Sequence, residues 1–280
     1  MDYAHALNWA QRLLESNNIG TSRLDALVLL EDNSEIDRAK ILASPETIVG
    51  PKVLKRFQSQ IRRRATQEPL AYIRSKTEFF SREFYVDKRV LEPRPESEAI
   101  IEQLGRIMTK VAGTGPTVVD VGTGSGALAI TAKLETPLAL VLATDISPDA
   151  IDVARRNAVR HKADIIFSIG NLIEPLPAAT WDSPNVIVIA NLPYVPDSWH
   201  INAAARYEPE FAIFGGKDGL SPYRRLFKNL SSLPNPPAYV LTEAMPPQQL
   251  KLAQIASRHG FRLSQTIDFV QLFSLERSPT

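Results

Sequence analysis

The sequence contains no cysteine, and this absence excludes disulfide bonds and thiolate metal ligands. Its four histidines are scattered without metal-ligand spacing, so we expect no metal site. No apolar run approaches the roughly 20 residues of a membrane span, and the chain does not start with the basic-then-apolar pattern of a secretory signal. Together these absences predict a cytoplasmic protein that does not enter a membrane.

An excess of charge is also missing. The chain has 32 basic and 31 acidic residues, a formal net charge of +1, so bulk electrostatics does not favour nucleic acid as a partner. Hydrophobic residues make up 44% of the 280 positions, which is enough for a substantial core. This length permits one large domain with a second, small one. We expect a monomer.

The first 75 residues predict a small helical domain. Apolar side chains recur at helical spacing from Tyr3 to Leu14, then after Ser22, a predicted N-cap, and again from Val53 to Ile61. Basic residues lie on this last helix without an acidic residue between them: Lys52, Lys55, Arg56, Arg62, Arg63 and Arg64. Two interpretations stay open for them, a solvated helix face or a docking surface for an acidic or RNA-associated partner.

Residues 76–95 predict a β-hairpin linker. Apolar and aromatic residues flank a predicted turn at Ser81-Arg82, and Pro93 and Pro95 exclude helix at the junction that follows. The next helix is indicated by an apolar stripe from Ile100 to Val111.

From Thr117 onward, short apolar strands alternate with helices, which predicts an α/β fold with a Rossmann-like parallel sheet in a domain at 96–280. The expected strands are 117–121, 138–144, 164–169, 185–190 and 238–242. The expected helices lie near 125–134, 148–161, 221–231 and 246–258. The segments 261–267 and 270–275 predict a terminal antiparallel pair.

A glycine-rich loop follows the first of these strands: Gly122, Thr123, Gly124, Ser125 and Gly126. Glycines allow close backbone approach to a ligand and tolerate positive φ. Asp145 ends the next strand, close to the roughly 20-residue spacing at which a carboxylate meets ribose hydroxyls. The combination predicts a nucleoside cofactor, against the alternative of a structural turn. The loop lacks a Lys-Ser/Thr ending, which argues against a nucleoside triphosphate.

The fourth strand ends in the tetrapeptide Asn191, Leu192, Pro193 and Tyr194. The Asn191 side-chain oxygen and the Leu192 carbonyl can accept hydrogen bonds from one NH2 group, and the Tyr194 ring offers a face for stacking. We interpret these residues as catalytic, in methyl transfer to an sp2 nitrogen. The alternative is a strand that simply ends in a turn.

The chain resembles the HemK/PrmC protein-(glutamine-N5) methyltransferases. The resemblance covers almost the whole length and depends on five stretches: Glu68–Ile73, Val90–Glu98, Asp120–Gly126, Asp145–Ser147 and Tyr207–Arg224. It implies a seven-stranded class I methyltransferase fold with a small N-terminal helical domain. It also implies S-adenosylmethionine as cofactor and, as substrate, the glutamine of the Gly-Gly-Gln motif in class 1 peptide chain release factors.

The resemblance implies roles for particular residues. The loop 122–126 would hold S-adenosylmethionine, Asp145 its ribose, and Asn171 and Leu172 its adenine. Asn191 and the Leu192 carbonyl would hold the glutamine amide against Tyr194, and Asn191 would also contact the cofactor. The N-terminal domain would dock the release factor, giving Arg62, Arg63 and Arg64 a role. The sequence departs from the family at three positions: Leu192 replaces proline, Asn171 replaces aspartate and Glu92 replaces an apolar residue.

Other functions stay open. An adenine-N6 methyltransferase acting on rRNA or DNA would use the same acceptor pair, but a flipped base needs a basic channel, which the near-zero net charge disfavours. A methyltransferase-like binding protein would keep the fold and lose turnover. A nicotinamide oxidoreductase would leave the tetrapeptide at 191–194 without a role.

Overall fold

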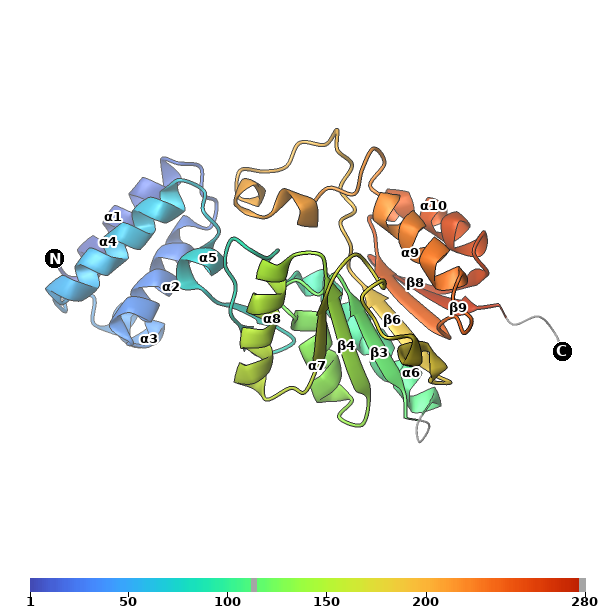
Figure 1. Cartoon of the computed structure of the whole chain (residues 1–280). Coiled ribbons are helices and arrows are strands. Elements are labelled where there is room, and N and C mark those ends of the chain that lie inside the picture. Colours follow the sequence, from blue (N-terminus) through green and yellow to red (C-terminus); the bar gives the residue numbers. More distant parts are fainter. Residues whose placement is uncertain (112–114, 277–280) are drawn as a thin grey trace. The chain divides into compact units, whose positions relative to one another are not determined.

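The computed structural model describes residues 1–111 and 115–276 (Figure 1). The chain forms two compact units, one of Met1–Lys76 with Ile201–Tyr207 and the other of Thr77–His200 with Glu208–Thr280. The domain predicted at 96–280 includes residues 112–114 and 277–280, which lie outside the described part of the chain.

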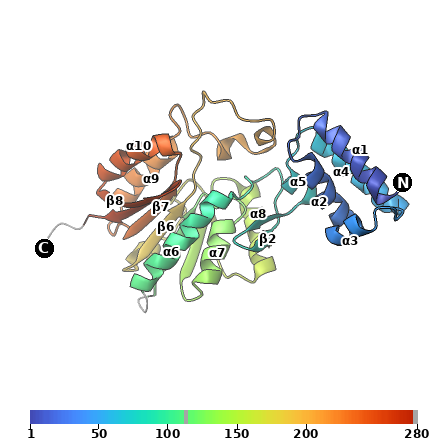
Figure 2. The ribbon, with the colours of Figure 1, turned by 180° about the vertical axis from the view of Figure 1, so that it is seen from behind.

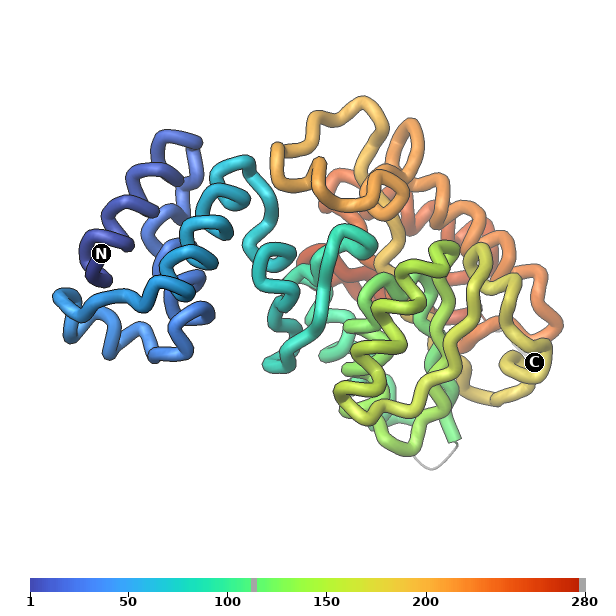
Figure 3. Tube along the Cα trace, turned by 60° about the vertical axis from the view of Figure 1, so that its left-hand side comes forward, coloured from blue at the N-terminus to red at the C-terminus, as the bar shows by residue number. Residues whose placement is uncertain are grey.

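The first unit is helical, and the N-terminal helices pack around a core that includes Leu14, Leu30 and Phe57 (Figure 3). Its helices are α1 (Tyr3–Glu15), α2 (Ser22–Ser34), α3 (Arg38–Ala43), α4 (Pro51–Ala65) and α5 (Leu70–Arg74). The N-cap predicted at Ser22 is wrong, because α2 begins at Ser22 itself and Thr21 precedes it.

The basic helix predicted from the sequence is α4, and three of its arginines have partners inside the helical unit. The contacts are Arg64 to Asp25 at 2.7 Å, Arg63 to Glu68 at 2.5 Å and Arg62 to the ring of Trp9 at 5.8 Å. Arg64 and Asp25 are largely buried, so this pair belongs to the packing of α4 against α2. Lys52, Lys55 and Arg56 are exposed.

The second unit contains a seven-stranded sheet in the order β5-β4-β3-β6-β7-β9-β8 (Figure 1). The strands are β3 (Thr117–Val121), β4 (Leu140–Asp145), β5 (Ile166–Ile169), β6 (Val186–Ala190), β7 (Tyr239–Glu243), β8 (Phe261–Ile267) and β9 (Val270–Leu275). The first five in spatial order are parallel, and β9 runs antiparallel to both β7 and β8. The predicted α/β fold and terminal antiparallel pair are confirmed.

Helices cover both faces of this sheet, as its buried apolar strands require. Helices α6 (Glu98–Lys110), α7 (Ala127–Glu135) and α8 (Pro148–His161) pack with one face of the sheet, where Figure 2 shows α6 and α7 in front of it. Helices α9 (Ser221–Ser231) and α10 (Pro246–Ser257) pack with the other face. Strand β3 shows the alternation: Val118 belongs to the first core and Val119 to the second.

A two-stranded hairpin, β1 (Thr77–Phe79) and β2 (Arg82–Phe84), precedes the sheet. Its turn is Phe80-Ser81, with φ of 50° and 58°. The turn predicted at Ser81-Arg82 is therefore one residue too late. Non-glycine residues rarely take positive φ, so the residue types at this turn are a poor guide to its position.

The topology determines where a ligand site lies. Strand order reverses at β3, between β4 on one side and β6 on the other, and this switch point opens a crevice at the carboxyl ends of the strands. The segments after β3, β4 and β6 begin with Gly122, Ile146 and Asn191.

Within residues 1–111 and 115–276, no helix combines the length and hydropathy needed to cross a membrane.

Candidate active site

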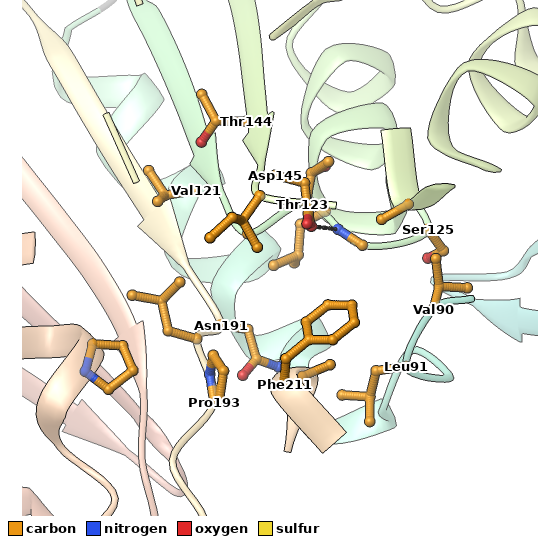
Figure 4. Close-up of a pocket in the computed structure, with 18 of the residues that line it drawn as sticks. Val90, Leu91, Val121, Thr123, Ser125, Thr144, Asp145, Asn191, Pro193 and Phe211 are labelled. Atoms are coloured by element: carbon orange, nitrogen blue, oxygen red, sulfur yellow. Dashed lines mark hydrogen bonds between the residues drawn. The ribbon is translucent and has the colours of Figure 1, made fainter. Parts of the chain in front are cut away.

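A cavity of about 370 Å³ lies at this switch point (Figure 4). Its wall comes from several parts of the second unit: β1, the segment before α6, the ends of β3 and β4 with the starts of α7 and α8, the segment after β5, and the segments after β6 as far as the start of α9. Every predicted site residue except Gly126 and Tyr194 is among the residues that line it. The structure thus brings most of the predicted site together around one hollow.

The glycine loop takes a conformation that side chains would disturb. Gly122, Gly124 and Gly126 have φ of 77°, 54° and 82°. A Cβ on Gly122 would lie 2.9 Å from Leu192 Cδ2, and one on Gly126 would lie 3.1 Å from Ala154 Cβ. The loop therefore needs glycine both for its backbone angles and for its close packing.

Asp145 fastens the glycine loop to the end of β4. Its Oδ2 accepts a hydrogen bond from the Gly124 backbone N–H at 2.9 Å (Figure 4), and its Oδ1 accepts one from the Ser147 N–H at 2.9 Å. Burial raises the pKa of the Asp145 carboxyl. Ser147 also caps α8 by accepting from the Ala150 N–H. The carboxylate thus faces the cavity in a fixed position.

Asp120 stabilises the glycine loop by hydrogen bonds, a role that the sequence analysis did not assign. Its Oδ2 accepts from the Thr123 hydroxyl at 2.6 Å and from the Ala129 N–H at 3.1 Å. Within the described residues its Oδ1 has no hydrogen-bond partner. Burial raises the pKa of Asp120 to about 7, against the effect of these hydrogen bonds. Its position as the first residue of the Asp120–Gly126 stretch was the available signal.

Asn171 and Leu172 follow β5 and line the other end of the cavity. Asn171 Nδ2 donates to the Glu174 carboxylate at 2.9 Å. The amide nitrogen is thereby turned toward Glu174, which leaves the Asn171 oxygen as an acceptor. Replacing aspartate by asparagine at this position therefore keeps an acceptor and removes a charge.

Asn191 is held by a chain of side chains from two other elements. Its Nδ2 donates to Ser97 Oγ at 2.8 Å, and the Ser97 hydroxyl donates to Glu243 Oε2 at 2.6 Å. Ser97 ends the short helix η1 (Pro95–Ser97), and Glu243 is the last residue of β7. Burial raises the pKa of the Glu243 carboxyl, while its hydrogen bonds oppose the shift. Neither Ser97 nor Glu243 was among the site residues predicted from the sequence.

Leu192 is fixed by both its backbone and its side chain. Its N–H donates to Tyr223 Oη at 3.1 Å, and the Tyr223 hydroxyl donates to the Glu243 carbonyl at 2.5 Å. The Leu192 carbonyl lies farther from Tyr223 Oη, at 3.4 Å, so it keeps accepting capacity. Its side chain is buried beside Gly122. These contacts hold the backbone where the family has proline.

Tyr194 turns its hydroxyl toward Glu243. That hydroxyl donates to Oε1 at 2.9 Å, and the ring packs against the hydrophobic core. Among the described residues, the aromatic side chains lining the cavity are Phe79, Phe211 and Phe214. Figure 4 shows Phe211, which is 53% exposed, at the same cavity as Asn191. Stacking by Tyr194 stays a prediction, and Phe211 is an aromatic residue that sequence reasoning missed.

The backbone after Asn191 is clamped by two glycines. A Cβ on Gly215 would lie 2.4 Å from the Pro193 carbonyl oxygen, and one on Gly219 would lie 2.0 Å from the Tyr194 carbonyl oxygen. Gln248 Nε2 donates to that Tyr194 oxygen at 2.7 Å. These close approaches give a physical reason for Gly215 and Gly219 within the Tyr207–Arg224 stretch.

An ion pair joins the segment before α6 to the loop that follows β6. Arg94 Nη2 lies 2.7 Å from Glu208 Oε2, and the Glu92 N–H points at the same carboxylate at 3.4 Å. Burial raises the pKa of Glu208, and the positive charge of Arg94 opposes this. The side chain that replaces an apolar residue, Glu92, accepts from the Thr77 hydroxyl at 2.9 Å.

Comparison with known proteins adds a second line of evidence. A family model described as the PrmC N-terminal domain matches residues 5–74, and one described as ribosomal protein L11 methyltransferase (PrmA) matches residues 101–193. Among solved structures, the hMettl16 catalytic domain in complex with MAT2A 3'UTR hairpin 1 has a TM-score of 0.54 at 12% identity. The similarity covers 80% of this chain and 79% of that one, and it supports the fold. Fold and site together define an S-adenosylmethionine-dependent methyltransferase.

Sequence relatives identify the family. The release factor glutamine methyltransferase of Geobacter sulfurreducens is 33% identical over 258 residues, 91% of this chain and 88% of that protein. The release factor glutamine methyltransferase of Bacillus subtilis is 34% identical over 243 residues, 85% of this chain and 83% of that protein. The chain belongs to the release factor glutamine methyltransferase family, which confirms the resemblance seen in the sequence.

The residues present suit S-adenosylmethionine. Gly122 and Gly124 leave the cavity floor free of Cβ atoms, and Gly122 would meet Leu192 if it carried one. The Asp145 carboxylate offers acceptors for hydroxyl groups, and the Asn171 oxygen offers one for an amino group. Carboxylate, amide oxygen and apolar wall are the groups that ribose and adenine require.

Proposed function

We propose that this protein methylates the side-chain amide nitrogen, N5, of the glutamine in the Gly-Gly-Gln motif of class 1 peptide chain release factors. The observation that carries the proposal is the orientation of Asn191. Because its Nδ2 is given to Ser97, its oxygen is left to accept a hydrogen bond from a substrate NH2 group. Two relatives that align with this chain over most of their own length are named release factor glutamine methyltransferases, which supports the same substrate class.

In the proposed reaction the chain works mainly by placement. When bound, S-adenosylmethionine supplies a methyl group on a positively charged sulfur. The Asn191 oxygen and the Leu192 carbonyl each accept one N–H of the glutamine amide, which fixes the plane of the acceptor and exposes one face of its nitrogen. They also stabilise the positive charge that grows on this nitrogen as the N–CH3 bond forms and the S–CH3 bond breaks. The methylated nitrogen then releases one proton to solvent, and the sulfur would leave as a neutral thioether. Well-oriented reactants can lower a barrier by roughly 7–11 kcal/mol.

We assign cofactor contacts to residues on the other strands. Gly122–Gly126 would hold the methionine and ribose parts, the Asp145 carboxylate would accept from ribose hydroxyls, and Asn171 and Leu172 would contact the adenine. The cofactor residues lie after β3, at the end of β4 and after β5, whereas the residues proposed to hold the amide follow β6. This separation supports the division. Changes at Asn191 should therefore leave cofactor affinity nearly unchanged.

We assign release factor docking to residues 1–75. The match of residues 5–74 to the PrmC N-terminal domain supports this role. On α4, the exposed cations are the best candidates for contact with an acidic surface: Lys52, Lys55 and Arg56. Arg64 is a poor candidate because it is buried against Asp25.

The test is to incubate the protein with labelled S-adenosylmethionine and a class 1 release factor, and to locate the label by peptide mass spectrometry. We expect one methyl group on the Gly-Gly-Gln glutamine. Asn191→Ala should lower kcat by at least about 10²-fold, by analogy with loss of one oriented polar contact at a developing charge, with cofactor affinity kept. Glu102→Gln, on the exposed side of α6 and away from the cavity, is the control and should keep full activity. Label on another residue, or on rRNA only, would refute the proposal.

A further inference from the structure

We propose that Ser97 and Glu243 are positioning residues that fix which end of the Asn191 amide faces the substrate. The inference rests on the proposed function for its activity assay, and it concerns residues that need not touch the substrate. Ser97 lies 94 residues from Asn191, and Glu243 lies 146 residues from Ser97, so three separate elements must meet for this arrangement.

The hydrogen bonds form a directed chain. Glu243 accepts on both carboxylate oxygens, from Tyr194 on Oε1 and from Ser97 on Oε2. Since the single hydroxyl hydrogen of Ser97 goes to Glu243, Ser97 Oγ can only accept from Asn191. Asn191 must then present its NH2 to Ser97 and its oxygen to the cavity. An asparagine with the opposite orientation would offer a donor to a substrate NH2, which is also a donor.

Burial makes this direction costly to reverse. Glu243 is 0% exposed and Ser97 is 3% exposed. A buried donor or acceptor without a partner costs about 1–3 kcal/mol, and a flipped Asn191 amide would place two acceptors against each other. The hydrogen-bond chain therefore selects one of the two nearly isosteric orientations of the Asn191 amide.

Ser97 directly precedes α6, and its backbone angles (φ −71°, ψ −13°) are helical, unlike the extended angles with which a serine oxygen caps a helix. In the described structure it makes no such capping bond, and its oxygen accepts from Asn191 instead. The hydroxyl serves the site rather than the helix end.

The direction of the chain can be inverted by exchanging acid and amide. In the double variant Asn191→Asp with Glu243→Gln, the new amide NH2 at position 243 can donate to Ser97 Oγ, and the Ser97 hydroxyl can donate to the new carboxylate at position 191. Tyr194 keeps an acceptor, the amide oxygen at position 243. The double variant carries the same charge as the natural protein and again presents an oxygen to the cavity.

Each single substitution breaks the match of donors with acceptors along this chain of hydrogen bonds. With Asn191→Asp alone, Ser97 lies between two carboxylates and can donate to only one. With Glu243→Gln alone, position 243 has one acceptor oxygen in place of two. That oxygen can take the place of the carboxylate oxygen that accepted from Ser97 or of the one that accepted from Tyr194, but not of both. We expect each single variant to lose about 10²-fold in kcat, with cofactor affinity and the KM for release factor changed much less. Glu102→Gln is the matched acid-to-amide control on exposed α6.

The decisive activity measurement is the double-mutant cycle. We expect the double variant to be at least about 10-fold more active than either single variant, because neighbours in one hydrogen-bond chain are strongly coupled. A loss equal to the product of the two single losses would overturn the proposal. Ser97→Ala should also lower kcat, and Ser97→Thr, which keeps the hydroxyl, should restore most of it. Equal losses in the alanine and threonine variants would contradict the proposal.

A readout without substrate separates this inference from the proposed function. The side-chain 15NH2 signal of Asn191, assigned by its absence in Asn191→Asp, reports the bond to Ser97 in the ligand-free protein. We expect Ser97→Ala to shift this signal toward a free amide and Ser97→Thr to keep it. An unshifted signal in Ser97→Ala refutes the positioning role. A shifted signal in a protein that transfers no methyl to release factors supports the positioning role and refutes the proposed function alone.

Discussion

Gly215→Ala should damage catalysis without damaging cofactor binding. A Cβ at position 215 would lie 2.3 Å from the Gly219 carbonyl oxygen and 2.4 Å from the Pro193 carbonyl oxygen, whereas ordinary contacts begin at 3.4 Å. Both opposing atoms are backbone, so no rotamer change relieves the overlap. The segment containing Pro193, or the one containing Gly219, must move by about 1 Å.

A movement of this size falls on the residues that we propose to hold the amide. Pro193 is two residues from Asn191, and a 1 Å misplacement at a reacting centre costs roughly 10²-fold in rate. We therefore expect kcat to fall by about 10²-fold. Affinity for S-adenosylmethionine should change by less than about 3-fold, because the glycine loop follows β3 and Asp145 ends β4, whereas the clamp acts on the segment after β6.

Steady-state kinetics with release factor, calorimetric titration with S-adenosylmethionine and a thermal melt together make the assay. Gly105→Ala is the matched control: it lies in the middle of α6 with nothing within 4 Å of a new Cβ. This control should keep full activity and gain roughly 0.5–1 kcal/mol of stability. Natural kcat in a folded Gly215→Ala variant would refute the reasoning.

Three further predictions concern cofactor binding and stability. Asp145→Asn should weaken S-adenosylmethionine binding by roughly 10–10²-fold, since a hydrogen bond to a charged group contributes about 1.5–3 kcal/mol; calorimetric titration measures it, and unchanged affinity would contradict the assignment. Burial raises the pKa of Asp120 from 3.8 to about 7, so folding favours the protonated form and the natural protein loses stability as pH rises through this interval. Asp120→Asn should remove a loss of up to about 4 kcal/mol, so urea unfolding should show the variant gaining relative to the natural protein as pH rises from about 4 to about 7; a pH-independent difference would speak against it. Arg64→Ala should destabilise the helical unit by about 3–5 kcal/mol, because it leaves Asp25 buried and unpaired, whereas exposed Arg56→Ala should change the unfolding free energy by less than about 0.5 kcal/mol; equal effects would contradict the buried-pair account.

Much of the fold was predictable because its signals are local. The strand at 117–121 and the helices at 148–161 and 221–231 have the bounds that the sequence pattern predicted. The strand predicted at 164–169 is shorter in the structure, where β5 is Ile166–Ile169. This edge strand has exposed and half-buried side chains, so burial did not sharpen its start.

The glycine loop and the tetrapeptide were predictable as a pair for a topological reason. Gly122 and Asn191 follow adjacent parallel strands, β3 and β6, so their positions at one edge of the sheet follow from the strand order alone. Asp145 joins them because β4 is the other neighbour of β3. Periodicity and turn residues were sufficient to place these three features together.

Side-chain direction was not predictable in the same way. Tyr194 was expected to face the substrate, but its hydroxyl is bound by Glu243, whose carboxylate also holds Ser97. This depends on the end of β7 and the start of α6 meeting in space, which no local pattern encodes. The partners of Arg64 were missed for the same reason, since Asp25 lies on another helix.

The central claim is that the Asn191 oxygen holds the amide nitrogen that receives the methyl group. The most direct test is a structure of the ternary complex with S-adenosylhomocysteine and a Gly-Gly-Gln peptide. We expect the Asn191 oxygen within about 2.7–3.2 Å of the glutamine nitrogen, with Asn191 Nδ2 still donating to Ser97. A complex in which the glutamine amide contacts other groups, and the Asn191 oxygen points away from it, would contradict the account.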